Sequence, residues 1–191
     1  MSQRLPVNLQ SPAKSMTHLV RRDVVLPEEL FFRAAQPSDE NLIFHNFNES
    51  VRVTCKIFNT MPPAGISPAN ARRCLRQILT NLLRRGAAVV MLADSSEADN
   101  VAGWICFERK EKRVCIHHLY VKAALRELGY GTYLYRFATR DLTDDDTVYV
   151  SLLSPLARNI LDEHRIPYQH RPELLFAANT FQTIEDQHAQ I

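Results

Sequence analysis

The stretch HHLYVKAALRELGYGTYL, residues 117–134, places an arginine and two glycines between a predicted strand and a predicted helix. N–H groups in the first turn of a helix have no acceptor within the helix, and the helix dipole favours negative charge there. Gly129 and Gly131 allow a ligand to approach the backbone closely, and Arg126 supplies a forked donor that suits phosphate oxygens. These residues predict a diphosphate cradle over residues 126–132.

A structural alternative stays open, in which the two glycines only end a strand and open a helix. A short GxG pattern is a weak signal on its own. The pattern is not a P-loop, because no GKS or GKT follows, and it lacks the GxGxxG spacing of a dinucleotide fold. The preceding strand also belongs to a predicted meander rather than to a βαβ unit.

Length and composition predict one globular domain over residues 26–180. Residues 1–25 are interpreted as an N-terminal arm, and residues 181–191 as a polar C-terminal tail. With 46% apolar residues, 23% charged residues and a net charge of +2, the chain has no basic field that would indicate nucleic acid. It has no apolar run of about 18 residues that would span a membrane, and no apolar core of a signal peptide near its start.

The four cysteines do not form a metal-binding pattern. Cys55, Cys74, Cys106 and Cys115 are far apart, and no two make a CxxC pair, so a zinc site is not expected. They lie in apolar periodic segments, where a free cysteine packs as a small hydrophobe. This usage indicates a reducing compartment, and we expect a cytoplasmic protein.

The order of the predicted elements indicates an α/β (α+β) fold. Short polar turns join strands 87–94, 100–109 and 113–121 into an antiparallel meander. A strand at 146–153 follows a helix and must therefore pair in parallel. The remaining predictions are strands at 30–35 and 173–178 and helices at 37–47, 67–86, 129–142 and 154–165. We expect a mixed, mostly antiparallel central sheet with helices on both faces.

The clearest predicted helix, at residues 67–86, has an arginine-rich side. Ser67 is expected to cap it, Pro68 to open it, and Gly86 to follow its end. The arginines have two interpretations, a solvated face or a surface for an acidic partner or substrate.

The spacing around the glycines resembles the acetyl-CoA-binding signature of the GNAT N-acetyltransferase superfamily. That signature has an Arg or Gln five residues after a strand-ending valine, and glycines at eight and ten. Val121, Arg126, Gly129 and Gly131 meet every spacing. Gly103 also lies where the family's strand typically has a glycine. The resemblance follows the order of elements over residues 30–178, and it is specific over residues 115–132.

The resemblance implies a set of cofactor contacts. The pyrophosphate of acetyl-CoA would bind at the turn, and the pantetheine arm would pair with the strand where the sheet opens between residues 113–121 and 147–153. The thiol end would lie near the last strand-to-helix junction. The implied residues are, in that order, Arg126, Glu127, Leu128, Gly129, Tyr130, Gly131 and Thr132; Leu119 and Val121; and Ser154 and Asn159.

A general base is expected on the same strand, since an amine must lose a proton before it attacks the thioester. Some family members carry an acid or a histidine four or six residues before the valine, which implies His117 or Cys115. Strict strand alternation places His117 on the face of Leu119 and His118 on the opposite face. We expect His117 to act directly or through a water; the alternative is a hydrogen-bonded structural histidine.

One departure from the family concerns the proton donor for the leaving thiolate. Many members have a tyrosine four residues after an alanine on the helix after the last parallel strand. With Ala157 as that alanine, the position is Leu161, which cannot donate. Tyr168 is the nearest downstream tyrosine and is the candidate donor, and His164 is also close.

Two functions remain open on the sequence. The first is an acetyl-CoA-dependent N-acetyltransferase whose acceptor is the primary amine of a small molecule or a protein. Residues 48–68 would line the acceptor pocket, and they contain no cluster of acids that would favour a polyamine. The second is a catalytically impaired member of the fold that binds CoA or a protein partner. A homodimer is compatible with both.

Overall fold

A six-stranded mixed sheet forms the centre of the computed structural model, which describes residues 25–54, 67–143, 146–163 and 165–188. The strands follow one another across the sheet in chain order. The first four are antiparallel neighbours, and the last two pairings are parallel. The strands are β1 (Leu30–Ala34), β2 (Ala88–Asp94), β3 (Val101–Lys110), β4 (Arg113–Val121), β5 (Thr147–Val150) and β6 (Gln169–His170).

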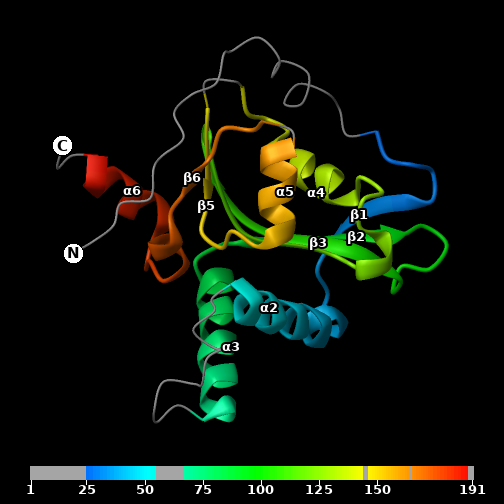
Figure 1. The fold of residues 1–191 in the computed structure, drawn as a ribbon, viewed down its shortest axis with the longest axis horizontal. Coiled ribbons are helices and arrows are strands. Elements are labelled where there is room, and N and C mark those ends of the chain that lie inside the picture. Colours follow the sequence, from blue (N-terminus) through cyan, green and yellow to red (C-terminus); the bar gives the residue numbers. More distant parts are fainter. Residues whose placement is uncertain (1–24, 55–66, 144–145, 164, 189–191) are drawn as a thin grey trace.

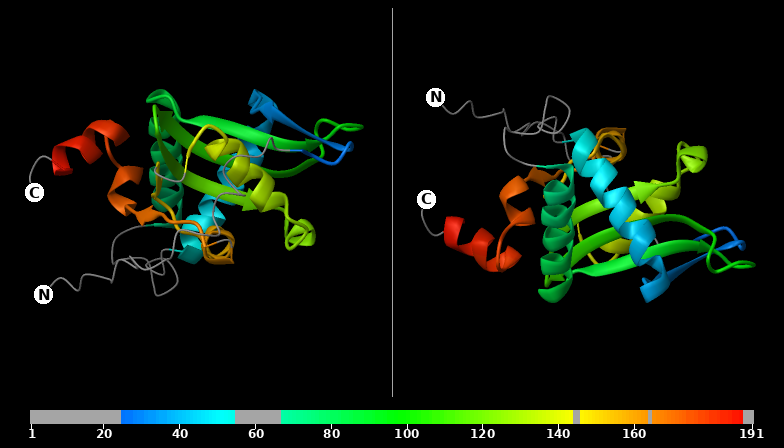
Figure 2. Two further views of the ribbon diagram at one scale, coloured as in Figure 1. Left: turned by 90° about the horizontal axis from the view of Figure 1, so that it is seen from above. Right: turned by 90° about the horizontal axis from the view of Figure 1, so that it is seen from below.

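Helices cover both faces of this sheet, as Figures 1 and 2 show. One face carries α2 (Glu40–Thr54) and α3 (Pro68–Arg84), and the other carries α4 (Tyr130–Thr139) and α5 (Pro155–Glu163). A fifth helix, α6 (Thr180–His188), ends the described chain. Short 3-10 turns are η1 (Pro37–Asp39), η3 (Ala123–Leu125) and η4 (Pro172–Leu175). The predicted fold class is confirmed.

Each face of the sheet has its own hydrophobic core. Alternation along β3 divides the cores, because Ile105 packs towards α4 and α5 whereas Trp104 packs towards α2 and α3. The largest side chains of the second core are fully buried, among them Phe47, Leu79 and Trp104. No helix in the described part of the chain is long and apolar enough to cross a membrane.

The helix at Pro68–Arg84 forms as predicted. The Ser67 hydroxyl accepts a hydrogen bond from the Asn70 N–H at 3.2 Å, which satisfies a first-turn donor. Gly86 follows the helix at φ +100°, a left-handed conformation that glycine adopts readily. Cys106 and Cys115 are buried as expected, whereas Cys74 is exposed; Cys55 lies outside the described residues.

The strand predicted at 173–178 is wrong. The last strand is the short β6, and the Arg171 N–H donates to the Val150 carbonyl just after it. Pro172 comes next and has no N–H with which to continue the ladder. The chain turns into η4 instead, with hydrogen bonds from Leu174 to Arg171 and from Phe176 to Glu173.

The polar tail predicted at 181–191 contains most of α6. Phe181 and Ile184 are buried with Cys115, Tyr149 and Leu174, so this helix covers part of the sheet. Two apolar residues three positions apart are enough to anchor a short helix whose other residues are polar. The predicted arm lies outside the described residues except for Val25, and the independence of residues 26–180 stays a prediction.

A β-bulge in β4 overturns the prediction for the two histidines. Across β3, Phe107 pairs with Ile116 and Cys106 pairs with His118, which leaves His117 without an opposite residue. The extra residue shifts the alternation by one position. His117 and His118 therefore both lie on the face away from α4 and α5, and His117 does not share a face with Leu119 as strict alternation predicted.

We predict that Gly103→Ala destabilises the fold. A Cβ at this position would lie 2.5 Å from the Tyr120 carbonyl oxygen, which belongs to the paired backbone of β4 and has little freedom to move. Overpacking of this kind lowers the free energy of unfolding by about 1–3 kcal/mol. Urea unfolding of the variant would measure the loss. An unchanged midpoint would mean that the two strands separate easily here.

Candidate functional site

The pairing between β4 and β5 stops halfway along β4. It runs from Arg113 opposite Thr147 to Ile116 opposite Val150. The Ser151 N–H then donates to the Ile116 carbonyl at 3.0 Å, after which the chain leaves the sheet towards α5. The rest of β4 faces an opening on this side. The predicted parting of the two strands is therefore present.

A small apolar cavity lies at this opening, on the side of α4 and α5. A Cβ on Gly131 would meet Ile160 Cδ1 at 2.4 Å and Leu119 Cδ2 at 3.7 Å, which places β4, α4 and α5 in close contact. The lining residues come from both strands and both helices, and they are Ile116, Leu119, Tyr135, Val150, Ala157, Ile160 and Leu161. With a volume of about 10 Å³ it has room for about one water molecule, so it is a gap in the packing of β4, β5, α4 and α5.

The predicted cradle is an exposed turn at the N-terminus of α4. Gly129 caps the helix at φ +82°, and a Cβ there would meet nothing within 4 Å, so the space in front of the turn is open. Glu127 is also left-handed, at φ +69°. Arg126 is exposed and donates from Nε to the Val121 carbonyl at 3.3 Å. The turn therefore presents helix N–H groups and a guanidinium to solvent, as an anion site requires.

The other predicted cradle residues divide between solvent and core. Leu128 is 59% exposed, an unusual position for a leucine. Tyr130 is half-buried against the core beneath α4, and Thr132 is half-buried in the first turn of that helix. Gly131 is buried, and its lack of a side chain serves the contact with Ile160. The structure therefore gives Gly129 and Gly131 different roles, a left-handed turn and a close helix contact.

The residues predicted near the thiol end lie at the start of α5. Ser154 is buried and caps this helix, because its hydroxyl accepts from the Ala157 N–H at 3.2 Å. Asn159 is exposed on the same helix. Leu161, the position at which the family tyrosine was expected, lines the cavity.

The predicted proton donor does not border the cavity. Tyr168 is half-buried against the core beneath α4 and α5 but is not among the residues that line the cavity. Burial, with a smaller effect from Asp162, raises the pKa of its phenol. Tyr135, which sequence reasoning missed, does line the cavity, and burial raises the pKa of its phenol too. His164 lies outside the described residues.

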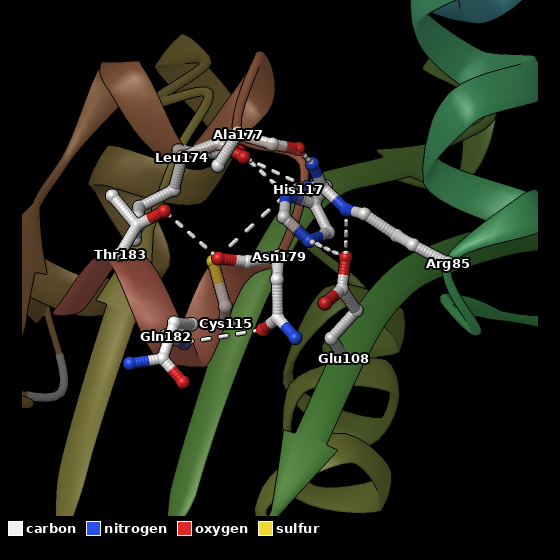
Figure 3. A network of polar contacts seen from close by, with 10 residues as sticks. Arg85, Glu108, Cys115, His117, Leu174, Ala177, Asn179, Gln182 and Thr183 are labelled. Carbon is white, nitrogen blue, oxygen red and sulfur yellow. Dashed lines mark hydrogen bonds and ion pairs between the residues drawn. The ribbon is translucent and has the colours of Figure 1, made fainter. Parts of the chain in front are cut away.

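His117 belongs to a buried polar network on the opposite face of the sheet (Figure 3). Its Nδ1 lies 2.8 Å from the Ser151 hydroxyl, and its Nε2 lies 3.1 Å from Glu108 Oε1. The same carboxylate oxygen accepts from Arg85 Nε at 2.5 Å. His117 has no exposed surface, so both of its nitrogens are occupied by protein groups in a site closed to solvent.

The charges of this network balance. Burial lowers the pKa of His117, and the opposing hydrogen bond and charge of Glu108 do not reverse this. Burial alone would raise the pKa of Glu108, but its bonds and charges with His117 and Arg85 lower it. We assign a charged Arg85–Glu108 pair beside a neutral His117. An ionised carboxylate only accepts, so Nε2 carries the imidazole proton and Nδ1 accepts from Ser151.

Cys115, the second position at which the family places a base, is unsuited to that role. Its sulfur lies 3.9 Å from His117 Nδ1, and burial raises the pKa of the thiol. The thiol therefore stays protonated near neutral pH.

Sequence reasoning missed Arg85, Glu108 and Ser151 as members of this network. One signal for Glu108 was present, since it alternates with Trp104 and Cys106 and so puts a carboxylate on the buried face of an apolar strand. A buried carboxylate needs a partner. The identity of that partner depends on how α3 and β4 pack, which the sequence pattern does not contain.

His118 has a different environment from its neighbour. It is fully buried, stacked on Trp104 with ring centroids 4.4 Å apart, and it lies edge-on to Phe47 at 5.5 Å. Among the described residues, neither ring nitrogen has a hydrogen-bond partner. Burial lowers the pKa of His118 to about 3, so it packs as a neutral aromatic ring.

A model of the acetyltransferase (GNAT) family matches residues 54–158, more than half of the chain. The chain belongs to this family. The match includes the cradle, β4, β5 and the first part of α5, so the resemblance noted in the sequence is confirmed. No curated protein matches the sequence significantly.

Several solved acetyltransferases have a distantly similar structure. A GNAT-family acetyltransferase of Staphylococcus aureus Mu50 is 16% identical with a TM-score of 0.37, and the match covers 57% of this chain and 62% of that one. The PaiA N-acetyltransferase of Thermoplasma acidophilum, solved with coenzyme A, is 17% identical with a TM-score of 0.39, covering 57% and 69%. Likeness at this level does not extend the activity of those proteins to this GNAT-family chain.

We predict that His118 makes stability depend on pH. The unfolded histidine has a pKa near 6.5 and the folded one a pKa of about 3, so the unfolded state binds more protons below pH 6.5. The stability contribution is complete above pH 6.5 and declines as the pH falls. Between pH 7 and pH 5 the wild type should lose about 2 kcal/mol more than His118→Phe, measured by urea unfolding.

The exposed His45 of α2 provides the control for this measurement. His45→Ala should keep the wild-type difference between the two pH values. Equal pH dependence in wild type and His118→Phe would contradict the neutral, unpaired state of His118.

Proposed function

We propose that this protein transfers an acetyl group from acetyl-CoA directly to a primary amine. The observation that carries the proposal is the exposed α4 turn, with Arg126 and Gly129, at the open side of the β4–β5 parting in a GNAT-family chain. The apolar side chains that α4 and α5 place beside the parted strands also support it, because such a surface suits the uncharged arm of the cofactor.

The residues of this chain would hold acetyl-CoA in three places. Arg126 and the N–H groups of Gly129, Tyr130 and Gly131 would bind the pyrophosphate, helped by the backbone of residues 127 and 128. The Thr132 N–H donates to the Gly129 carbonyl at 3.0 Å and would have to release it to join them. Unpaired backbone of Leu119 and Val121 would bind the pantetheine arm, after the Arg126 side chain releases the Val121 carbonyl. Ser154 and Asn159 would lie near the thiol end. The bound cofactor supplies the activated thioester.

His117 is our candidate for the base that removes the amine proton. Because Glu108 and Ser151 occupy its two nitrogens, the proton would reach the ring through an intermediate group rather than by direct contact. A lowered pKa keeps the imidazole neutral near pH 7, which a base requires. The same geometry supports the alternative of a structural histidine, so the role needs a direct test.

The leaving thiolate requires a proton, and Tyr168 stays our candidate for the donor. Leu161 lines the cavity without a proton to give. A leucine in place of the family tyrosine favours the second candidate function, a GNAT-fold protein that binds CoA with little turnover. The acceptor segment at 48–68 is largely outside the described residues, so the amine is defined only as one carried by a small molecule or a protein.

The first test is the melting temperature in acetyl-CoA. A ligand that binds the folded state must raise it. We expect a clear rise for the wild type and about a tenfold weaker affinity for Arg126→Glu, because the variant turns an attractive charge into a repulsive one. Gly129→Val should also weaken binding, since valine is strained at the left-handed φ of +82°.

Arg72→Glu is the matched control, because Arg72 is an exposed arginine of α3 on the other face of the sheet. It should bind acetyl-CoA as the wild type does. If millimolar acetyl-CoA does not raise the melting temperature of the wild type, the proposed function is wrong. If both cradle variants keep the wild-type affinity for acetyl-CoA, only the pyrophosphate assignment is wrong.

A second prediction concerns His117. With n-butylamine, a lysine peptide and a dipeptide as acceptors, His117→Ala should release CoA about 100-fold more slowly than the wild type. Its acetyl-CoA affinity should fall far less than its rate. The wild-type rate should rise with pH at a midpoint below 6.5, because the base acts when neutral and its pKa is lowered. A variant that keeps the wild-type rate at every pH would exclude His117 as the base.

A further inference from the structure

The hydrogen bond between Ser151 and His117 lies where β4 and β5 separate. The Ser151 N–H bonds the Ile116 carbonyl at 3.0 Å, the last backbone link between the two chain segments in the described residues. The Ser151 hydroxyl then reaches His117, one residue further along β4, at 2.8 Å. Two successive contacts of one residue thus hold the strands together at the edge of the opening.

The imidazole that receives this bond is itself fixed. Glu108 holds its other nitrogen from β3, and Arg85 holds Glu108 from the end of α3. The guanidinium of Arg85 also donates to two backbone carbonyls near the C-terminus, those of Leu174, at 2.7 Å, and Ala177. His117 is therefore anchored to a helix, a strand and the C-terminal segment as well as to β4.

Alternation along β4 makes this contact possible. Ile116 packs towards α4 and α5, so its neighbour His117 points to the other face, where Glu108 lies. The bulge then returns Leu119 to the face of α4 and α5. The bond is also shielded from water, since His117 is 0% and Ser151 2% exposed. A buried bond of this kind is difficult to replace, because breaking it leaves Nδ1 of the imidazole with only the Cys115 sulfur, at 3.9 Å.

We propose that Ser151 is a positioning residue that sets the distance between β4 and β5 at the start of the opening. By holding His117, it fixes the width of the slot that the proposed function assigns to the pantetheine arm. This inference rests on that function and adds a residue that acts through another rather than by touching the cofactor. It predicts that loss of the Ser151 hydroxyl weakens binding of the pantetheine arm and leaves binding of the phosphates at the cradle unchanged.

Two probes separate the arm from the cradle. Coenzyme A carries both the phosphates and the pantetheine arm, whereas adenosine 3′-phosphate 5′-diphosphate keeps the pyrophosphate and lacks the arm. Ser151→Ala should bind coenzyme A about tenfold more weakly than the wild type, as measured by calorimetry, and should bind the arm-less nucleotide within about twofold of it. A residue that only stabilises the fold would not alter one affinity and spare the other.

Three further variants make the test decisive. Ser151→Thr keeps the hydroxyl and should restore most of the coenzyme A affinity. Glu108→Gln loosens His117 from the far side and should reproduce the selective loss, which matters if Ser151→Ala does not fold. Thr139→Val removes another buried hydroxyl, bonded to the Tyr135 carbonyl of α4 and remote from the network, and should change neither affinity.

The outcomes distinguish this inference from the proposed function. Selective loss of coenzyme A binding, rescued by threonine, supports it. Coenzyme A binding by Ser151→Ala at wild-type strength, or an equal loss for both probes, overturns it while leaving the proposed function intact. A wild type that does not bind coenzyme A removes the proposed function, and the inference falls with it.

Discussion

The separation of two parallel strands after four residue pairs is the constraint on which this structure depends. Beyond Ile116, β4 loses its neighbour on one side, and a sheet with unpaired backbone in its interior is unstable unless something else satisfies or covers it. Here α4 and α5 cover the opening from one face with apolar side chains. On the other face, a polar network fastens the last paired residues together.

The two faces therefore use opposite physical means. Below α4 and α5, apolar side chains cover the parted strands, and burying them is favourable without any hydrogen bond. Gly131 permits this packing because its lack of a side chain lets α4 approach Ile160 of α5 closely. On the far face, a guanidinium and a carboxylate are largely removed from water, which is favourable only when each donor and acceptor is matched. The neutral His117 adds hydrogen bonds to this pair without adding a charge that would need another counterion.

Much of the architecture was accessible from the sequence because local rules determine it. The capped helix at Ser67, the three-strand meander and the parallel return of β5 follow from turn residues and apolar periodicity. The exposed glycine turn before α4 was accessible for the same reason, since its residues are contiguous. The relation of His117 to that turn was not, because a one-residue bulge put His117 and Leu119 on opposite faces, and no local pattern marks a bulge between two histidines. Likewise, η4 replaced a predicted strand because Pro172 ended the ladder.

The contacts of Arg85 with the C-terminal segment constrain which sequence changes this segment tolerates. The guanidinium binds the carbonyls of Leu174 and Ala177, and every amino acid carries that group. Side chains in this stretch can therefore change without loss of the contact, as the exposed Phe176 illustrates. The number of residues between β6 and α6 cannot change so freely, because an insertion would move the carbonyls out of reach. Substitutions should be tolerated here far better than insertions and deletions.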